Sequence, residues 1–437
     1  MVATTLPTRM AFEMGETPWS PSSWRRSGTV KRHMPVYVDK RQLIHTKNRL
    51  REVPPLIFAR ETQTLKERLS CAQMGEGFVL QGGDCAESIT VESKDGVIEL
   101  VELLNEMAFT LSYHFEIPVF TIARVAGQYA KPRSSPTETR EGVTLPAFMG
   151  TIVNSPTFEK AKRDPDPTRM MTAYRHASSV QTMIRSMVSS GFVGTDQVAS
   201  SLKDGYARKA ARMLKSRDNL FSDETLYISH EALLLEYEEC LTRMDRNTGE
   251  WYNTAAHMVW LGERTRFPSS AHVEYLSGIA NPIGIKVGPS ADVDQIRTIL
   301  AKINPSRETG KIVLIFRMGV RDMVMNLPPL LYGLKEESAV FMVDPMHGNT
   351  RESASTALKT RNVEDIFKEM VFFHRTCVRF GIHFGGAHLE LCGSDRIYEC
   401  VGRGGEPDPL RYTTLCDPRL NASQSMQLVE FLVRECM

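Results

Sequence analysis

A thiol lies between two acidic residues, just after a glycine pair, in the stretch FVLQGGDCAES, Phe78–Ser88. The apolar residues before the glycines are typical of a short strand, so Cys85 should lie just beyond the end of that strand, between Asp84 and Glu87. The thiolate form of cysteine is a strong ligand for divalent transition metals. We therefore predict that Cys85 binds a metal ion and that distant parts of the chain supply the other ligands.

Three more potential ligands are His347, Glu390 and Asp417. Together with Cys85 they offer one thiolate, one imidazole and two carboxylates, and they leave room for water or substrate. This mixture suits a divalent transition ion better than Mg²⁺ or Ca²⁺, so we expect Mn or Co, with Fe and Zn as further candidates. The four residues are far apart in sequence and share no local motif, so their spacing alone does not establish the site.

Basic side chains also follow strand-like runs. In one pocket these charges would repel one another unless an anion bound among them. Guanidinium groups match phosphate and carboxylate oxygens in a bidentate manner, whereas an ammonium acts as a point charge. The set therefore predicts a ligand with a phosphate and a carboxylate. It consists of Arg124, Arg264, Lys286 and Arg317.

A second basic segment, Lys131-Pro132-Arg133-Ser134, offers another phosphate site. Pro132 stiffens the backbone, and the hydroxyl group of Ser134 can donate a hydrogen bond. Two phosphate sites imply two phosphorylated substrates.

These residues can meet only if the fold gathers the ends of their strands. Eight short runs, rich in β-branched or aromatic residues, suit buried parallel strands covered by helices. They are Phe78–Gln81, Val119–Arg124, Leu226–Ser229, Met258–Leu261, Ile283–Val287, Ile312–Phe316, Ala339–Val343 and Ala387–Leu391.

Amphipathic stretches separate the runs and predict helices. Eight strand–helix units argue for an α/β fold of the (β/α)8 TIM-barrel type. The alternative is a doubly wound open sheet, but that fold would want a GxGxxG turn where Gly82-Gly83 is followed by Asp84-Cys85. The predicted helices are Arg41–Ser70 (broken at Pro54-Pro55), Val97–Phe115, Thr168–Ser189, Lys203–Lys215, Glu231–Arg243, Val293–Ile303, Val363–Phe380 and Ser423–Arg434.

A barrel of this type assembles its active site at the C-terminal ends of its strands. Nearly every predicted strand here delivers a charged or metal-binding side chain at that end, a coincidence that independent structural roles would not produce. In strand order these are Cys85, Arg124, His230, Glu263 with Arg264, Lys286, Arg317, Asp344 with His347, and His388 with Glu390.

Two segments extend the predicted barrel. Residues 1–50 look like an N-terminal arm, either an oligomer contact or partly disordered, and its Trp19 and Trp24 suggest that it packs on something. Residues 51–437 form the predicted catalytic barrel, with a helical insertion at about 135–225. Long insertions in barrels are usually lids, regulatory elements or oligomer contacts, so we expect a homo-oligomer.

The overall composition excludes some function classes. The chain has 437 residues and a formal net charge of +1, so nothing favours nucleic acid or a membrane surface as a partner. Its eight cysteines form no CxxC pair, and no apolar run approaches the ~18 residues of a membrane span. We expect a cytoplasmic protein with reduced thiols.

An ordered series of motifs identifies the family that the chain resembles. The series is GFVLQGGDCAES, ARVAGQYAKPRS, SHEALLLEYE, WLGERTR, HVEYLSGIANPIGIKVGP, RMG with LPPL, DPMHGNT, GGAHLELCG and CDPRLN. It resembles that of the class II (plant-type) 3-deoxy-D-arabino-heptulosonate 7-phosphate (DAHP) synthases, from about Trp19 to Arg434. The resemblance implies a (β/α)8 barrel that condenses phosphoenolpyruvate with erythrose 4-phosphate, with metal assistance, at the entry to the shikimate pathway.

The same resemblance implies roles for individual residues. Cys85, His347, Glu390 and Asp417 match the metal ligands; Arg124, Glu263, Arg264, Lys286 and Arg317 match the phosphoenolpyruvate site; Lys131, Arg133 and Ser134 match the loop for the aldose phosphate. Cys85, Lys286, Glu263 and His347 are the expected catalytic residues. Glu263 is a candidate for activating the attacking water, with a purely structural role equally open.

The sequence departs from the family pattern close to some of these motifs. Phe341 and Val343 stand where the family usually has Trp and Cys, Cys392 replaces a Thr, and Thr151 replaces an Asp. These changes leave three alternatives open: an amino or otherwise altered aldose phosphate, a paralogue of specialised metabolism, and a non-catalytic regulatory paralogue. A shorter stretch between Gly191 and Tyr227 would fit a specialised paralogue.

Cys416 directly precedes the expected metal ligand Asp417. If its thiol lies near Cys85, oxidation could join the two in a disulfide and expel the metal. An inert buried thiol is the other interpretation.

Overall fold

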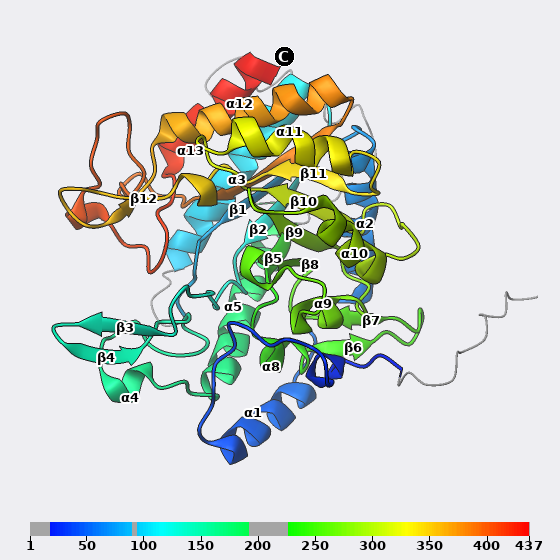
Figure 1. The fold of residues 1–437 in the computed structure, drawn as a ribbon, viewed down its shortest axis with the longest axis vertical. Helices are drawn as coiled ribbons and strands as arrows, with labels where there is room; N and C mark the ends of the chain where they lie inside the picture. Colours follow the sequence, from blue (N-terminus) through cyan, green and yellow to red (C-terminus); the bar gives the residue numbers. More distant parts are fainter. Residues whose placement is uncertain (1–17, 90–93, 192–225, 437) are drawn as a thin grey trace, which may run out of the picture.

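The computed structural model describes residues 18–89, 94–191 and 226–436 (Figure 1). Eight parallel strands close into a barrel in the order β1-β14-β11-β10-β9-β8-β5-β2, so the predicted (β/α)8 fold is confirmed and the open sheet is excluded. The strands are β1 (Phe78–Gly83), β2 (Val119–Arg124), β5 (Tyr227–Glu231), β8 (Met258–Leu261), β9 (Ile283–Val287), β10 (Ile312–Phe316), β11 (Val340–Val343) and β14 (Phe384–Glu390).

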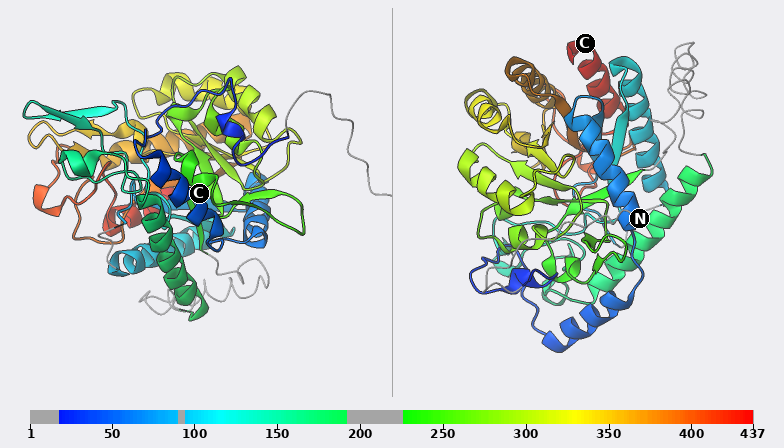
Figure 2. Two further views of the ribbon diagram at one scale, coloured as in Figure 1. Left: turned by 90° about the horizontal axis from the view of Figure 1, so that it is seen from below. Right: turned by 90° about the vertical axis from the view of Figure 1, so that its right-hand side faces the viewer.

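Helices surround the strands, as Figure 2 shows from two further directions. Local signals fix their ends: Asp292 and Asn362 accept hydrogen bonds from the first-turn amides of α10 and α12. Gly381, at φ +68°, ends α12 in the left-handed conformation that favours glycine. The helices are α3 (Lys94–Phe115), α5 (Arg169–Ser189), α9 (Ala271–Leu276), α10 (Val293–Ile303), α11 (Met323–Leu334), α12 (Val363–Phe380) and α13 (Ala422–Cys436).

A separate apolar core fills the inside of the barrel towards its N-terminal end. Val79, Ile122 and Met342 belong to it, together with Leu65 and Leu69 of α2 (Ala59–Gln73). The helix is tied to the starts of two strands, because its Gln73 accepts a hydrogen bond from the amide of Gly310 and donates one to Ser338. Helix α2 therefore covers the N-terminal end of the barrel, and the opposite end is left for chemistry.

The prediction of a helix at Glu231–Arg243 is wrong. The segment holds a single turn, α8 (Leu235–Glu238), followed by β6 (Thr242–Met244), which pairs with β7 (Trp251–Asn253). Its acidic side chains are buried and serve as anchors for the arm instead of forming the exposed face of a helix. A second hairpin, β3 (Thr137–Arg140) with β4 (Val143–Pro146), and the one-turn helix α4 (Lys160–Arg163) lie in the expected insertion.

The described part of the arm packs on the chain's own barrel. Trp24, in the turn η1 (Ser23–Arg25), is 1% exposed, and its indole nitrogen donates to Glu239 at 2.8 Å. Lys47 of α1 (Lys40–Glu52) pairs with the same carboxylate. Trp19 packs edge-on against Trp251, with ring centroids 6.0 Å apart.

The predicted stretch Lys203–Lys215 lies outside the described residues, as does most of the short stretch after Gly191. In the described part of the chain, no helix combines the length and the apolar character that a membrane span needs.

Candidate active site

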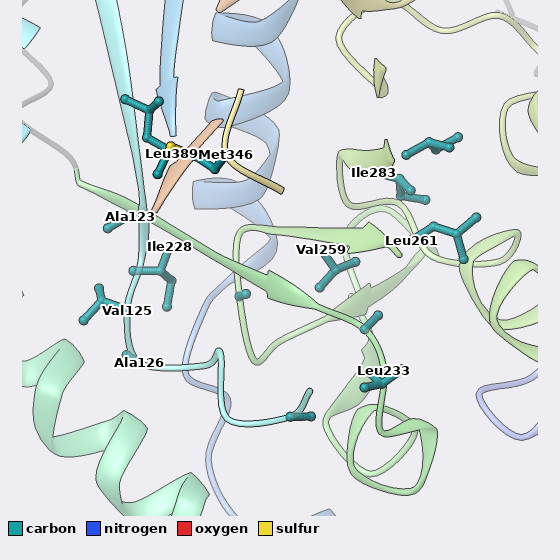
Figure 3. Close-up of a cluster of buried hydrophobic side chains, with 14 of the residues drawn as sticks. Ala123, Val125, Ala126, Ile228, Leu233, Val259, Leu261, Ile283, Met346 and Leu389 are labelled. Atoms are coloured by element: carbon teal, nitrogen blue, oxygen red, sulfur yellow. The ribbon is translucent and has the colours of Figure 1, made fainter. Parts of the chain in front are cut away.

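A cavity of about 310 Å³ opens at the C-terminal end of the barrel. The side chains that line it come from seven of the eight strands or the loops after them. The strands position them by alternation: in Figure 3, Ala123, Val259 and Leu389 belong to the outer core, while their neighbours Arg124 and Trp260 line the cavity. The charged residues that line it are Arg124, Lys131, Glu231, Glu263, Arg264, Lys286, Arg317, His347, Lys359 and Asp417.

The structure brings three of the four predicted metal ligands together and places the fourth beside one of them. Ligand atoms of Cys85, Glu390 and Asp417 all lie within 4.8 Å of one another. His347 joins them through Nε2, which is 3.0 Å from Glu390 Oε1. His347 therefore lies beside this group, in contact with Glu390, and the thiol and two carboxylates are the donors that the structure gathers. With the neighbouring imidazole they form a donor set that fits a divalent transition ion.

A tight turn after β1 places Cys85. The backbone of Gly83 has φ +144°, and a Cβ at that position would lie 2.5 Å from the carbonyl oxygen of Arg124, so only glycine fits. The same carbonyl accepts a hydrogen bond from the amide of Asp84 at 3.2 Å. The glycine pair noted in the sequence thus locks the first ligand to the neighbouring strand.

Lys131 lies inside the ligand group, although the sequence grouped it with the aldose phosphate. Its ammonium is 2.6 Å from Cys85 Sγ, 3.0 Å from Asp417 Oδ2 and 3.8 Å from Glu390 Oε1. Burial lowers the pKa of Lys131, but Asp417, Cys85 and Glu390 outweigh burial and hold that pKa well above its ordinary value. The ligands thus converge on a positive charge, which supports their fit to a metal cation.

Asp344 connects the ligand group to the cations. Its buried carboxylate accepts from His347 Nδ1 at 2.7 Å and pairs with the ammonium of Lys286. Although burial raises the pKa of Asp344, His347 and Lys286 hold it well below its ordinary value. Burial lowers the pKa of Lys286 to about 8, against the opposing effect of Asp344. Asp344 therefore orients a predicted metal ligand and a predicted substrate-binding cation at once.

A hydrogen-bonded chain inside the barrel fixes Arg124. Its Nη1 donates to His388 Nε2 at 2.8 Å, so the other ring nitrogen of His388 carries the proton and donates to Gln81 Oε1 at 2.7 Å. Gln81 in turn donates to Ser229 at 2.9 Å. The Nη2 of Arg124 donates to Glu390 and to the carbonyl oxygen of Cys85. Trp260 lies beneath the guanidinium, 5.3 Å from ring centroid to Arg124 Cζ.

Glu263 and Arg264 line the cavity as predicted. Both oxygens of Glu263 are held: Oε1 accepts from Arg266 at 2.7 Å, and Oε2 accepts from the amide of Gly288 at 2.8 Å. Arg264 donates to Ser134 at 3.2 Å. Arg133 is paired with Glu138 of β3 at 3.0 Å. Arg133 and Ser134 therefore lie next to the cavity without lining it.

Sequence reasoning missed three charged residues of the site. Lys359 donates to Asp417 at 2.8 Å, and Arg361 pairs with Glu390 at 2.6 Å. Both come from β13 (Lys359–Thr360) and the residue after it, where no periodic pattern marks an element. Glu231, at the end of β5, was assigned to the helix that does not form.

The departures from the family pattern do not line the 310 Å³ cavity. Phe341 and Val343 face the outer core, where Phe341 stacks on Phe316. Thr151 is buried, and its hydroxyl donates to the carbonyl oxygen of Glu87. Cys392 lines a neighbouring cavity of about 440 Å³.

Cys85 and Cys416 are free thiols joined by a hydrogen bond, which lowers the pKa of Cys416. We expect that metal-free protein treated with hydrogen peroxide does not recover its activity when metal is added back. The reason is that the two thiols can form a disulfide as peroxide is reduced to water. Dithiothreitol should restore the activity measured after metal is added back, and titration of free thiols should show the loss of two.

Two variants check this prediction. Cys416→Ser should keep most of its own untreated activity after peroxide, whereas Cys71→Ser, altered at a half-buried cysteine of α2, should be as sensitive as the unaltered protein. Equal inactivation of Cys416→Ser and the unaltered protein would count against the disulfide.

The sequence of this chain is similar to that of known proteins. A model of the class-II DAHP synthetase family matches residues 19–217 and 195–433. A phospho-2-dehydro-3-deoxyheptonate aldolase of Streptomyces coelicolor is 40% identical over 450 residues, which cover 98% of this chain and 99% of the relative. A protein of the same name from Neurospora crassa is 40% identical over 459 residues, 95% of this chain and 94% of its own length.

A solved structure is also similar at low identity. It is a truncated form of 3-deoxy-D-arabino-heptulosonate 7-phosphate synthase from Thermotoga maritima, with 14% identity and a TM-score of 0.37 over 82% of this chain and 86% of that one.

Proposed function

This chain belongs to the class-II DAHP synthetase family, and on that premise we propose that it condenses phosphoenolpyruvate with erythrose 4-phosphate to DAHP and inorganic phosphate. This transfer reaction is the first step of the shikimate pathway to chorismate and the aromatic amino acids. The two relatives named phospho-2-dehydro-3-deoxyheptonate aldolase support the activity over nearly the whole chain.

One observation carries the proposal: four cations line a single cavity, and the candidate metal group meets that cavity at Asp417. Phosphoenolpyruvate carries a phosphate and a carboxylate, which guanidinium forks and an ammonium bind well. We assign this role to Arg124, Arg264, Lys286 and Arg317, with Glu263 holding the loop geometry through Arg266 and Gly288.

We propose that Cys85, His347, Glu390 and Asp417 hold a divalent ion, Mn²⁺ or Co²⁺ first and Fe²⁺ or Zn²⁺ next. When bound there, such an ion supplies Lewis-acid polarisation of the aldehyde oxygen. The chain's own cations orient phosphoenolpyruvate so that its methylene carbon faces the aldehyde carbon, which turns a bimolecular encounter into a positioned one. Arg133 and Ser134, beside the cavity, would bind the aldose phosphate group, with Lys131 between them and the metal ligands.

The competing functions have less support. A non-catalytic paralogue is free to lose its site, yet the whole predicted set is present here. An altered aldose phosphate would call for changed residues in the cavity, and the departures Phe341, Val343, Cys392 and Thr151 do not line it. We therefore favour erythrose 4-phosphate and a role in primary metabolism.

Two further properties belong to the proposal. All eight cysteines are free, which supports a reducing compartment such as the cytoplasm. Val36 and Val38 of the arm are exposed by 75% and 89%, and we propose that they contact a second copy of the chain in a homo-oligomer.

The proposal predicts metal-dependent turnover of the two substrates. Protein treated with a chelator and then freed of it should not consume phosphoenolpyruvate, and Mn²⁺ or Co²⁺ should restore consumption together with equal release of phosphate. Mass spectrometry should find the seven-carbon product. No turnover with any divalent ion would contradict the proposal, and a higher kcat/KM with an amino aldose phosphate would favour the altered substrate.

A further inference from the structure

Of the four cations assigned to phosphoenolpyruvate, Arg317 depends most on its backbone for its position. Arg124 and Lys286 pair with buried carboxylates, and Arg264 donates to a serine hydroxyl. Arg317 lines the cavity, but its guanidinium has no hydrogen-bond or ion-pair partner in the described part of the chain. The loop after β10 must therefore fix this cation through its main chain.

A buried carboxylate outside the cavity holds that loop. Glu369 is 1% exposed and lies on α12, which packs beside α11 on the outside of the barrel (Figure 1). Its Oε1 accepts from the amides of Met318 and Gly319, at 2.7 and 2.9 Å. These two residues directly follow Arg317, so the carboxylate fixes the main chain next to the cation.

The other oxygen of Glu369 holds the loop of a predicted metal ligand. Its Oε2 accepts from Nδ2 of Asn349 at 2.7 Å, two residues after His347. Asn349 in turn accepts from the amide of Val320 at 2.9 Å and donates to the carbonyl oxygen of Pro345 at 2.8 Å. The carboxylate and the side-chain amide together join the loop after β10 to the loop after β11.

The two loops also meet backbone to backbone. Gly319 has φ +82°, and a Cβ at that position would lie 2.5 Å from the carbonyl oxygen of Gly348. A Cβ on Gly348 would in turn collide with the amide nitrogen of Gly319. At this contact no room is left for side chains to pack, so hydrogen bonds from outside have to hold the loops together.

The burial of a carboxylate is unfavourable, so its presence behind the site calls for an explanation. Burial raises the pKa of Glu369 to about 7, and the amides of Gly319 and Met318 oppose that rise. A glutamine in its place would have one acceptor oxygen and a group that donates, so it could not accept from both loops at once. The chain thus has a group with two acceptor oxygens where two loops of the active site meet.

We propose that Glu369 is a positioning residue for phosphoenolpyruvate and that it acts through Arg317. By tying the two amides after this cation to Asn349, it keeps the cation at the cavity before substrate arrives. The inference rests on the proposed function, in which Arg317 binds this substrate. Such preorganisation raises affinity, because a substrate binds only the fraction of molecules that already hold the cation in place.

Glu369→Gln tests the proposal in the metal-loaded full chain. Whichever way the new amide group turns, at least one hydrogen bond is lost, and one bond to a charged group can shift an equilibrium about tenfold or more. We expect the dissociation constant for phosphoenolpyruvate to rise about tenfold, measured by titration calorimetry without erythrose 4-phosphate. The KM for erythrose 4-phosphate should change less than threefold, because Lys131, Arg133 and Ser134 lie on a different loop.

A double variant shows whether Glu369 acts through Arg317. Arg317→Ala alone should weaken the binding of phosphoenolpyruvate, and adding Glu369→Gln should then change the dissociation constant less than threefold. An equal effect of Glu369→Gln with and without Arg317 would overturn the inference. Glu369→Asp, which keeps the charge but is one methylene group shorter, should show the same selective loss and replaces Glu369→Gln if that variant does not fold.

Glu239→Gln is the matched control. Glu239 is also a buried carboxylate that joins separate segments, since it accepts from Trp24 and pairs with Lys47 of the arm. Both glutamine variants should lower the melting temperature, but only Glu369→Gln should weaken the binding of phosphoenolpyruvate. A dissociation constant within threefold of the unaltered protein in Glu369→Gln would overturn the inference and leave Glu369 a purely structural role. Absence of substrate binding and turnover in the unaltered protein would instead refute the proposed function.

Discussion

Replacing Cys85 with serine should remove nearly all metal-dependent turnover. The alcohol stays protonated at neutral pH, so the site would lose its thiolate while Glu390, Asp417 and His347 stay in place. Because loss of a partner outside the ligand set typically costs a metal site about 10–100-fold, loss of a ligand should cost more than that. Metal content after gel filtration measures the loss of metal binding, and kcat with excess Mn²⁺ measures the loss of turnover in the loaded protein.

Cys240→Ser is the control for that substitution. Cys240 is buried like Cys85, but it lies outside the cavity and donates to the carbonyl oxygen of Glu236, a bond that serine can keep. This variant should bind metal and turn over normally. Full activity of Cys85→Ser at the metal concentration that saturates the unaltered protein would contradict the assignment of Cys85 as a metal ligand.

Arg124→Lys should raise the KM for phosphoenolpyruvate and lower kcat/KM by at least about 10²-fold. The guanidinium bonds His388, Glu390 and the carbonyl oxygen of Cys85 at once, and an ammonium cannot reproduce that fork. Each hydrogen bond to a charged group is worth about 1.5–3 kcal/mol, so losing even two reaches this effect. Steady-state kinetics at saturating erythrose 4-phosphate isolates the change.

The matched control is Arg243→Lys. Arg243 also binds backbone carbonyls, those of Cys240 and Val53, but far from the cavity. Its replacement should lower the melting temperature without changing the KM for phosphoenolpyruvate. An unchanged KM in Arg124→Lys would contradict the assignment of Arg124 to that substrate.

The strands could be predicted closely because buried parallel strands are continuous apolar runs. Val119–Arg124, Met258–Leu261, Ile283–Val287 and Ile312–Phe316 have the observed bounds. Once a barrel was predicted, most of the cavity residues could be predicted as well, because the C-terminal ends of all the parallel strands lie at the same end of a barrel.

Burial of charged residues caused the largest error. The stretch Glu231–Arg243 alternates acids and apolar residues as an exposed helix does, but Glu236, Glu238 and Glu239 are all buried. Glu236 and Glu239 bind Lys47 and Trp24 of the distant N-terminal arm, and Glu238 binds His230 at the end of β5. A helical pattern reveals none of these partners. The same error hid Glu231 at the end of a strand.

The loops posed a different problem. Lys131 was predicted to bind a phosphate because it lies in a basic segment, and its ammonium lies 2.6 Å from Cys85 Sγ, among the predicted metal ligands. Lys359 and Arg361 come from a loop without periodicity. Which loop folds over a barrel mouth depends on contacts made only after the barrel has closed.

The position of α2 across the N-terminal end of the barrel has a consequence for how substrates enter and products leave. Because α2 covers the N-terminal end, we expect the proposed substrates to enter from the C-terminal end of the barrel. Arg124 and Lys286 are 1% and 5% exposed, whereas Arg133 is half-buried and Ser134 is exposed. If phosphoenolpyruvate binds these cations as proposed, we expect it to bind before the aldose phosphate.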